Sequence, residues 1–261
     1  MIATIRQRQI LHRVTDAGAA RVADLARDLE VTEETIRRDL KTLSERGMLA
    51  RTHGGAVALE EGDDGRIELP YDTRDATRMV EKGAIARAAL RLIEPGTVIA
   101  LDASSTACQL AKLLPDQPMT VVTNSLVVCT LLARRERIEV VCTGGTLDAE
   151  AMAFGGLQAM RTLEAMNIAQ LFFSVRGVDL KRGLSEASDR HAAVKLQMLE
   201  SAQRRVLLAD TSKLGLASTV FFAPVEMADR MIVEASDEPG VLEALDEVHR
   251  RGVSVERAAM G

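Results

Sequence analysis

Residues Thr35 to Leu40 read TIRRDL, and the two adjacent arginines lie in the middle of a segment with helical periodicity. At 100° per residue, Ile36, Leu40 and Leu43 fall within roughly a 60° arc. Arg38 lies about 160–200° away from that arc. The spacing therefore predicts a helix whose aliphatic face packs inward and whose arginines are exposed. A solvated charged face and a DNA-binding face share this pattern, so the neighbouring sequence decides between them.

The residues around this helix predict a small domain of three helices and a hairpin. Helical periodicity runs from Ile5 to about Ala17, and VADLARDL (residues 22–29) gives a second short helix. The third helix runs from its predicted N-cap, Thr32, to about Arg46. MLARTHGGAV (residues 48–57) then predicts two strands joined by a Gly-Gly turn. This order makes a winged helix-turn-helix, whose third helix enters the major groove while the wing touches the DNA backbone.

The exposed residues of this domain are the candidate DNA contacts. Arginine suits phosphate oxygens and guanine edges, and threonine suits a phosphate or a thymine methyl group. Residues 1–58 carry a net charge of +2 and the other 203 residues a net charge of −7, which favours an anionic partner for the first segment alone. The candidate DNA-binding residues are Arg21, Glu33, Thr35, Arg37, Arg38, Lys41, Arg51, His53 and Gly54.

The rest of the chain alternates between apolar strands and helices. The acidic run ALEEGDDGRIELPYD (58–72) contains Gly and Pro, lacks periodicity, and predicts a linker between domains 1–57 and 73–261. Strands are expected at TVIALD, MTVVTN, IEVVCTGG, QLFFSVRG, RVLLAD, TVFFA and RMIVEA. Helices are expected at about 73–93, 106–114, 189–202 and 239–251, and one ends near Ala133. The alternation predicts an α/β fold, doubly wound around a mainly parallel sheet.

Each central strand ends in a polar cluster, and ligands of open α/β sheets bind outside the carboxyl ends of the strands. Hydroxyls, helix N-termini and the cations Arg176 and Lys213 favour a phosphate. Asp102 and Asp179 are expected to accept hydrogen bonds from sugar hydroxyls. The same residue types also cap helices whatever the function, which is the alternative reading. The candidate effector-binding residues are Lys82, Asp102, Ser104, Ser105, Thr106, Thr123, Asn124, Ser125, Gly144, Gly145, Thr146, Arg176, Asp179 and Lys213.

The run VADLARDLEVTEETIRRDLKTLSERGMLARTHGGA (22–56) resembles the signature of the DeoR/GlpR family of bacterial transcription regulators. That signature has a TIRRDL-type recognition helix and an R-x-H-G-G wing. The resemblance continues through Lys82-x-x-Ile-Ala86, VTNS (122–125), GGT (144–146), Gly177-Val-Asp179 and ADTSK (209–213), and covers nearly the whole chain. Two positions depart from the family pattern. Ser104 stands where members often have Gly, and Glu234 stands where an Asp is usual.

The resemblance implies a DNA-binding regulator, a repressor of a carbohydrate-metabolism operon, that binds operator DNA as a homo-dimer or homo-tetramer. Its effector domain would be similar in fold to ribose-5-phosphate isomerase and would sense a phosphorylated sugar or a related intermediate. The alternative is a sugar-phosphate isomerase-like enzyme that retains catalysis. Aligned with the isomerase, Val194 falls at the catalytic Glu and Arg176 at an active-site Asp, and neither side chain supplies the carboxylate base. We therefore expect a binding pocket without catalysis and without a cofactor.

Composition sets the remaining expectations. Cys108, Cys129 and Cys142 are expected to be small buried hydrophobes, which disfavours a third interpretation, a redox-responsive regulator. Neither these cysteines nor the four histidines have the spacing of metal ligands, so no metal site is expected. The sequence shows neither a signal-peptide pattern nor an apolar run of membrane-spanning length. We expect a bacterial cytoplasmic protein, nucleoid-associated when bound to DNA, with no membrane partner.

Overall fold

A computed structural model describes residues 3–45, 49–52, 54–57 and 71–260, which form two compact units. The N-terminal unit holds the described residues up to Val57 together with Tyr71–Met79, and the second unit begins at Val80. Of the predicted linker, only Tyr71 and Asp72 are among the described residues. The helix that begins at Tyr71 groups with the N-terminal unit, whereas the sequence predicted that the second domain begins at residue 73.

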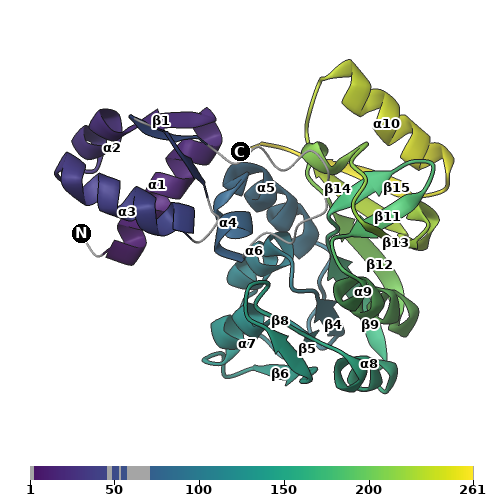
Figure 1. Ribbon diagram of the computed structural model, residues 1–261. Helices are drawn as coiled ribbons and strands as arrows, with labels where there is room; N and C mark the ends of the chain where they lie inside the picture. Colours follow the sequence, from purple (N-terminus) through teal and green to yellow (C-terminus); the bar gives the residue numbers. More distant parts are fainter. Residues whose placement is uncertain (1–2, 46–48, 53, 58–70, 261) are drawn as a thin grey trace. The chain divides into compact units, whose positions relative to one another are not determined.

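The N-terminal unit contains helices (Figure 1) and a small antiparallel sheet of order β1-β3-β2. The β2–β3 pair is the predicted wing, whereas β1 was not predicted. A Cβ on Gly55 of β3 would lie 2.1 Å from the carbonyl oxygen of Ala20 in β1, so this close pairing requires glycine. The elements are α1 (Ala3–Ala17), β1 (Ala19–Arg21), α2 (Val22–Asp28), α3 (Glu33–Glu45), β2 (Ala50–Arg51), β3 (Gly55–Val57) and α4 (Tyr71–Ala76).

Aliphatic side chains from the three main helices form the core of this unit. On α3, Ile36, Leu40 and Leu43 are at most 2% exposed, which confirms the inward face predicted from their spacing. They belong to one buried cluster with apolar residues of α1 and α2. The predicted cap is confirmed as well, because the hydroxyl of Thr32 accepts a hydrogen bond from the backbone N–H of Thr35 at 3.3 Å.

The helix predicted at residues 73–93 is two helices, α4 and α5 (Met79–Leu90). Arg78 between them has a φ of 49°, a left-handed conformation that interrupts an α-helix. Just before it, the hydroxyl of Thr77 donates to the carbonyl oxygens of Thr73 (3.3 Å) and Arg74 (3.0 Å). Such side-chain bonds compete with helix continuation. The prediction of one continuous helix is therefore wrong, because apolar periodicity does not report a change in backbone conformation.

The second unit is built on a seven-stranded sheet of order β15-β14-β12-β9-β4-β5-β6. Every neighbouring pair is parallel, which confirms the predicted α/β class. β4 lies near the middle of the sheet, and its residues Ile99, Ala100 and Leu101 are fully buried. The strands are β4 (Val98–Leu101), β5 (Met119–Thr123), β6 (Ile138–Cys142), β9 (Ile168–Phe173), β12 (Ala202–Leu208), β14 (Arg230–Glu234) and β15 (Ser254–Ala258).

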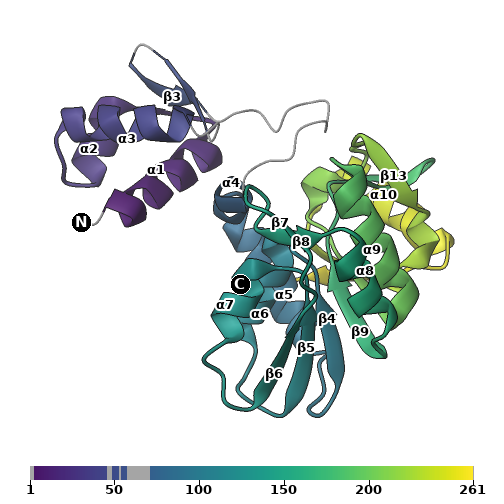
Figure 2. The ribbon, with the colours of Figure 1, turned by 60° about the horizontal axis from the view of Figure 1, so that its bottom comes forward.

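Helices cover both faces of this sheet, as expected for a doubly wound fold. α5, α6 (Ser105–Leu113) and α7 (Leu126–Leu132) lie over one face, and α8 (Leu157–Glu164) and α9 (Asp189–Ser201) lie over the other (Figure 2). α10 (Pro239–Arg250) shares a buried cluster with α8 and α9. Among the described residues, no helix is both long enough and apolar enough to cross a membrane.

Two smaller sheets complete the unit. β7 (Thr146–Asp148) and β8 (Ala153–Gly155) form a hairpin. β10 (Gly177–Asp179), β11 (Gly183–Glu186) and β13 (Val220–Ala223) form an antiparallel sheet that packs on α9. The predicted TVFFA strand is β13, so it belongs to this small sheet and not to the central one. The sequence did not predict β7, β8, α8, β10, β11 or β15.

Candidate functional site

The outward face of α3 carries two adjacent arginines in different surroundings. The Nη2 of Arg37 lies 2.6 Å from Oε2 of Glu33, and its Nη1 lies 3.8 Å from Oε2 of Glu34. Arg38 is exposed and forms no ion pair with any residue that the structure describes. Lys41, nearly one turn later, is exposed too. The guanidinium of Arg38 is therefore exposed and unengaged among the described residues, whereas that of Arg37 is held on the helix by glutamates.

Of the other predicted DNA-binding residues, those that the structure describes lie in α3, just before α2 and in the wing. The hydroxyl of Thr35 is 2.9 Å from that of Thr32, within the first turn of the helix. Arg21 is exposed at the residue before α2. Gly54 is exposed in the wing, and its carbonyl oxygen accepts from the backbone N–H of Val22 at 2.9 Å. Arg51 belongs to β2. His53 lies outside the described residues.

In the second unit, the strand order brings together loops that are far apart in the sequence. The adjacent strands β12, β9, β4, β5 and β6 are parallel, so their carboxyl ends meet along one edge. We call the loops at this edge the strand rim. Most of the predicted effector-binding residues lie on it, and in order along the edge it comprises the segments Asp210–Lys213, Ser174–Arg176, Asp102–Thr106, Thr123–Ser125 and Thr143–Thr146.

The loop after β4 is organised by a buried carboxylate. Asp102 is fully buried, and its Oδ1 accepts from the backbone N–H of Ser104 at 3.1 Å and from the Ser104 hydroxyl at 2.5 Å. Ser104 caps α6, because its Oγ also accepts from the backbone N–H of Ala107 at 3.1 Å. Ser105 and Thr106 are buried as well. The Oγ1 of Thr106 has no hydrogen-bond partner among the described residues.

The next two loops use hydroxyls and glycines. Ser125 caps α7 by accepting from the backbone N–H of Val128 at 3.2 Å, and the Thr123 hydroxyl accepts from the backbone N–H of Ser125 at 3.0 Å. Asn124 donates from Nδ2 to the carbonyl oxygen of Phe154 at 3.1 Å, which orients its amide. Its buried Oδ1 finds no partner in the part of the chain that the structure describes.

Glycine geometry shapes the loop after β6. Gly144 and Gly145 have φ values of 65° and 105°, which side chains other than glycine rarely adopt. A Cβ on Gly145 would also lie 2.5 Å from the carbonyl oxygen of Gly155. Thr146 follows, is exposed, and begins β7. The loop therefore requires glycine at both positions for the positive φ, and at Gly145 also because a side chain would clash with the backbone of Gly155.

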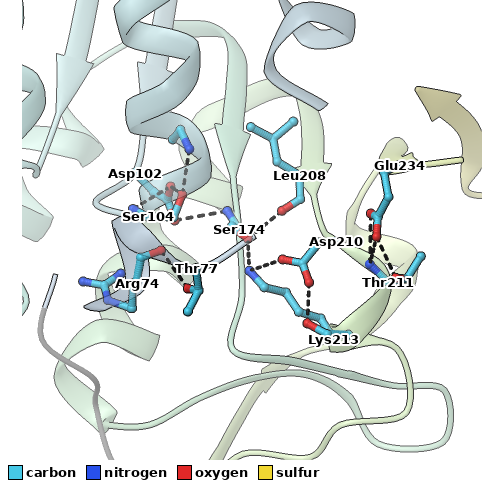
Figure 3. A network of polar contacts seen from close by, with 12 residues as sticks. Arg74, Thr77, Asp102, Ser104, Ser174, Leu208, Asp210, Thr211, Lys213 and Glu234 are labelled. Atoms are coloured by element: carbon cyan, nitrogen blue, oxygen red, sulfur yellow. Dashed lines mark hydrogen bonds and ion pairs between the residues drawn. The ribbon is translucent and has the colours of Figure 1, made fainter. Parts of the chain in front are cut away.

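Ser174, which the sequence did not single out, links the loop after β4 to the end of β12 and the loop that follows it (Figure 3). Its backbone N–H donates to Oδ2 of Asp102 at 3.2 Å, and its hydroxyl donates to the carbonyl oxygen of Leu208 at 2.5 Å. The Nζ of Lys213 donates to the same hydroxyl at 2.6 Å and lies 3.8 Å from Oδ2 of Asp210. Lys213 is thus a cation of the rim with 18% of its side chain exposed.

Three other predicted effector-binding residues lie in different settings. Arg176 is on the rim, and its Nε is buried without a partner among the described residues. Asp179 closes the β10–β11 turn instead, accepting from the backbone N–H groups of Lys181 (2.7 Å) and Arg182 (2.9 Å). The bond from Arg182 is the main reason that the pKa of Asp179 lies below its ordinary value. Lys82 is 4% exposed within α5 and belongs to no rim loop.

Two buried groups that support the rim were missed or left unexplained by the sequence. Lys195 of α9 pairs with Asp102 and with Glu186 of β11. Glu234, the departure from the family pattern, accepts from the backbone N–H of Thr211 at 3.0 and 3.1 Å and from its hydroxyl at 2.6 Å. Glu234 therefore fixes the loop that carries Lys213. These partners could not be predicted from the sequence, since each pair joins distant segments.

The cysteine prediction is wrong in part. Cys108 is buried as expected, but Cys129 is only half-buried and Cys142 is exposed at the end of β6. Burial, and then the neighbouring thiol of Cys142, raise the pKa of Cys129 to about 12. In the described ranges, no three His, Cys, Asp or Glu side chains form a group that could hold a metal ion.

Comparison with known proteins identifies both units. Residues 6–62 match the DeoR-like helix-turn-helix domain, and residues 77–235 match the DeoR C terminal sensor domain. The chain is 36% identical to the transcriptional regulator YulB of Bacillus subtilis over 95% of both chains. It is 36% identical to the L-fucose operon activator of Haemophilus influenzae, covering 88% of this chain and 92% of that one. It is 35% identical to the regulator GlpR of Haloferax volcanii over 98% of both chains.

The chain therefore belongs to the DeoR family of transcription regulators, and it is a regulator rather than an enzyme. Val194, predicted from the sequence to fall at the isomerase's catalytic glutamate, is 1% exposed in the apolar core. Among solved structures, ribose 5-phosphate isomerase A of Methanocaldococcus jannaschii gives a TM-score of 0.38 at 21% identity, over 51% of this chain and 53% of that one. The eIF2B β subunit of Chaetomium thermophilum gives a TM-score of 0.42 at 15% identity, over 61% and 51%.

Proposed function

We propose that this DeoR-family regulator represses a carbohydrate-metabolism operon in the bacterial cytoplasm, and that a phosphorylated sugar bound at the strand rim controls its hold on operator DNA. The observation that carries the proposal is the rim itself. Five loops from separate parts of the chain bring hydroxyls, backbone N–H groups and the cations Lys213 and Arg176 to one edge of the sheet. Hydroxyls and N–H groups near cations bind phosphate well.

The DNA-binding part of the proposal rests on α3. Its inward face is fully used by the core, so the outward face is available to the major groove. Arg38 has no competing ion pair within the described residues, and a guanidinium makes two parallel hydrogen bonds to guanine or contacts a phosphate. Lys41 adds a second exposed cation one turn away. Thr35, Arg37 and the wing residues Arg51 and His53 remain candidate contacts to the backbone.

The effector part rests on unsatisfied groups as well as on charge. The buried Thr106 Oγ1, Asn124 Oδ1 and Arg176 Nε lack partners among the described residues. A buried polar atom without a partner is costly, so such atoms are expected at a place where a polar ligand binds. A sugar supplies hydroxyl donors for the oxygens, and its phosphate supplies acceptors for Arg176 and Lys213.

Assembly and regulation complete the proposal. One winged helix buries too little DNA surface to be specific alone, so a homo-dimer or homo-tetramer formed through the second unit would present paired α3 helices to repeated half-sites. The effector must bind the DNA-free state more tightly than the DNA-bound state, because a ligand that binds both equally shifts neither. Names of relatives guide the choice of sugars, since one is an L-fucose operon activator.

Thermal unfolding with a panel of phosphorylated sugars, phosphorylated fucose included, tests the effector proposal. Each compound is paired with its unphosphorylated parent. A ligand at 100 times its dissociation constant adds about 2.7 kcal/mol, or roughly 5–10 °C for a domain of this size. We expect one phosphorylated member to raise the unfolding temperature and its parent to leave it unchanged. An unchanged temperature across the panel would contradict the effector proposal and would leave DNA binding standing.

A further inference from the structure

Lys195 points its ammonium group into the second unit, where it meets three oxygen atoms. Its Nζ lies 2.6 Å from Oδ2 of Asp102 and 2.9 Å from Oε1 of Glu186, and it also donates a hydrogen bond to the carbonyl oxygen of Ser174. Only 12% of the side chain is exposed. An ammonium group has three donors, so protein oxygens occupy all of them and none is left for a ligand.

This lysine keeps its charge although it is buried. Burial by itself would lower the pKa of Lys195, but the attraction of Asp102 and Glu186 outweighs burial and raises the pKa above its ordinary value. Two carboxylates therefore share one permanent cation. A buried charge that loses its partner is strongly unfavourable, so the position of Asp102 depends on Lys195.

Asp102 transmits this dependence to the rim. Its two oxygens accept four hydrogen bonds, two from Ser104, one from the backbone N–H of Ser174 and one from Lys195. Ser104 in turn caps α6 through the backbone N–H of Ala107. A single carboxylate thus fixes both the start of α6 and the segment after β9. Because its oxygens are used in this way, Asp102 is not left to receive the sugar hydroxyls that the sequence assigned to it.

We propose that Lys195 is a positioning residue of the strand rim. By holding Asp102, it keeps the Asp102–Thr106 loop in the shape that receives the anionic effector, and it does not touch the effector. This inference rests on the proposed function, since it concerns the same site. It also distinguishes Lys195 of α9 from Lys213 of the rim, because Lys213 acts on the ligand and Lys195 acts on the loop.

Two measurements on the full chain test this division of roles. Hydrogen exchange of the Ser104 and Ala107 backbone amides measures how often the Asp102–Thr106 loop and the start of α6 open. Titration with inorganic phosphate measures the affinity of the rim for an anion. We expect Lys195→Met to speed exchange at both amides by about tenfold or more, which corresponds to a loss of about 1.4 kcal/mol in the free energy of local opening. We also expect it to weaken phosphate binding. Lys213→Met is the matched variant. It should weaken phosphate binding while exchange at the two amides stays as in the unmodified chain.

The outcomes separate this inference from the proposed function. Unchanged exchange at Ser104 and Ala107 in Lys195→Met would overturn the positioning role, whatever happens to phosphate. Faster exchange with unchanged phosphate affinity would overturn the link between the loop and the site. Absence of phosphate binding by the unmodified chain would count against the proposed function, and the exchange result would still decide the role of Lys195. Lys195→Gln, which stays polar but loses the charge, replaces the Met variant if that variant fails to fold.

Discussion

The carboxylate of Asp39 accepts a hydrogen bond from Nε of Arg6 at 2.5 Å, and this ion pair ties α3 to α1. Gln7 donates to the other oxygen of the same carboxylate at 2.9 Å. Asp39 is therefore the inward-facing polar residue of TIRRDL, only 4% exposed beside the exposed Arg38. The motif combines a residue that anchors the helix with exposed arginines, which we propose contact DNA.

Asp39→Ala should destabilise the N-terminal unit. The side chains of Arg6 and Asp39 are 12% and 6% exposed, so the change leaves a nearly buried guanidinium without its carboxylate. Breaking a buried pair in this way costs about 3 kcal/mol. Urea unfolding followed by circular dichroism measures the loss. Glu33→Ala, which breaks an exposed pair on the same helix, should cost about 0.5 kcal/mol or less and is the control. Equal losses in both variants would show that the Arg6–Asp39 pair contributes no more to stability than an exposed pair.

Arg38→Ala should weaken binding to DNA from the protein's own promoter region while leaving the unfolding temperature unchanged. If Arg38 reads a guanine, the loss is about 1–3 kcal/mol on the correct site alone. If it contacts a phosphate, binding weakens on all sequences and the salt dependence falls by about one unit. Fluorescence anisotropy at several salt concentrations distinguishes these cases. Binding as tight as that of the unmodified chain would remove Arg38 from the interface.

Lys213→Ala should weaken effector binding and leave DNA binding unchanged, the reverse of what we expect for Arg38→Ala. It removes a cation of the rim, so binding of the phosphorylated sugar should weaken by about 1.5–3 kcal/mol, as for other charge-assisted hydrogen bonds, and the thermal shift at a fixed sugar concentration should shrink accordingly. DNA binding without effector should be unchanged, because Lys213 belongs to the second unit. Fluorescence anisotropy with and without the sugar measures DNA binding and its response to the effector, and thermal unfolding measures the shift. A variant that loses DNA binding and effector response together would argue against separable units.

Glu234→Ala should loosen the loop that carries Lys213. The change leaves the backbone N–H and the hydroxyl of Thr211 without the acceptor they use now, at a cost of about 1–3 kcal/mol. The same substitution at Glu243, an exposed glutamate of α10, should cost almost nothing. Thermal unfolding of the two variants provides the comparison. Similar unfolding temperatures for both would mean that the Glu234–Thr211 contact contributes little.

Alkylation should distinguish the cysteines by pH. At pH 8 a thiol with a pKa of about 12 is ionised in only about 10⁻⁴ of molecules, so Cys129 should react far more slowly than the exposed Cys142. Its rate should then rise about tenfold per pH unit until the pKa is reached. Peptide mass spectrometry after treatment with iodoacetamide measures both rates, with the buried Cys108 as an unreactive reference. Equal rates for Cys129 and Cys142 at pH 8 would contradict the raised pKa.

The features that were predictable from the sequence are those set by local spacing. Ile36, Leu40 and Leu43 recur with the helical period, so the direction of Arg38 followed from counting residues. The strand rim followed from a rule of topology, because the carboxyl ends of parallel strands share an edge and polar residues end each strand. Both arguments need only residues near each other in the chain.

The features that were not predictable depend on pairs distant in sequence. Lys195 lies 93 residues from Asp102. A single lysine on an amphipathic helix is ordinarily expected to face solvent, so the sequence did not indicate its burial. Arg6 and Asp39 are 33 residues apart and look like ordinary surface charges. The break at Arg78 and the three-residue strand β1 are too short to carry a periodic pattern. These contacts arise only from tertiary packing.

The order of strands in the central sheet has a consequence for synthesis of the chain. β4, β5 and β6 are neighbours both in sequence and in space, so they are able to pair as they leave the ribosome, whereas β9 and then β12 must add to the opposite edge of β4. The loops of the rim that follow β4, β5 and β6 thus form early, and Lys213 leaves the ribosome after all the other segments of the rim. A chain that ends before Lys213 would contain the whole DNA-binding unit but an unfinished sensor. Premature termination of translation before Lys213 would therefore release the N-terminal unit joined to an incomplete second unit.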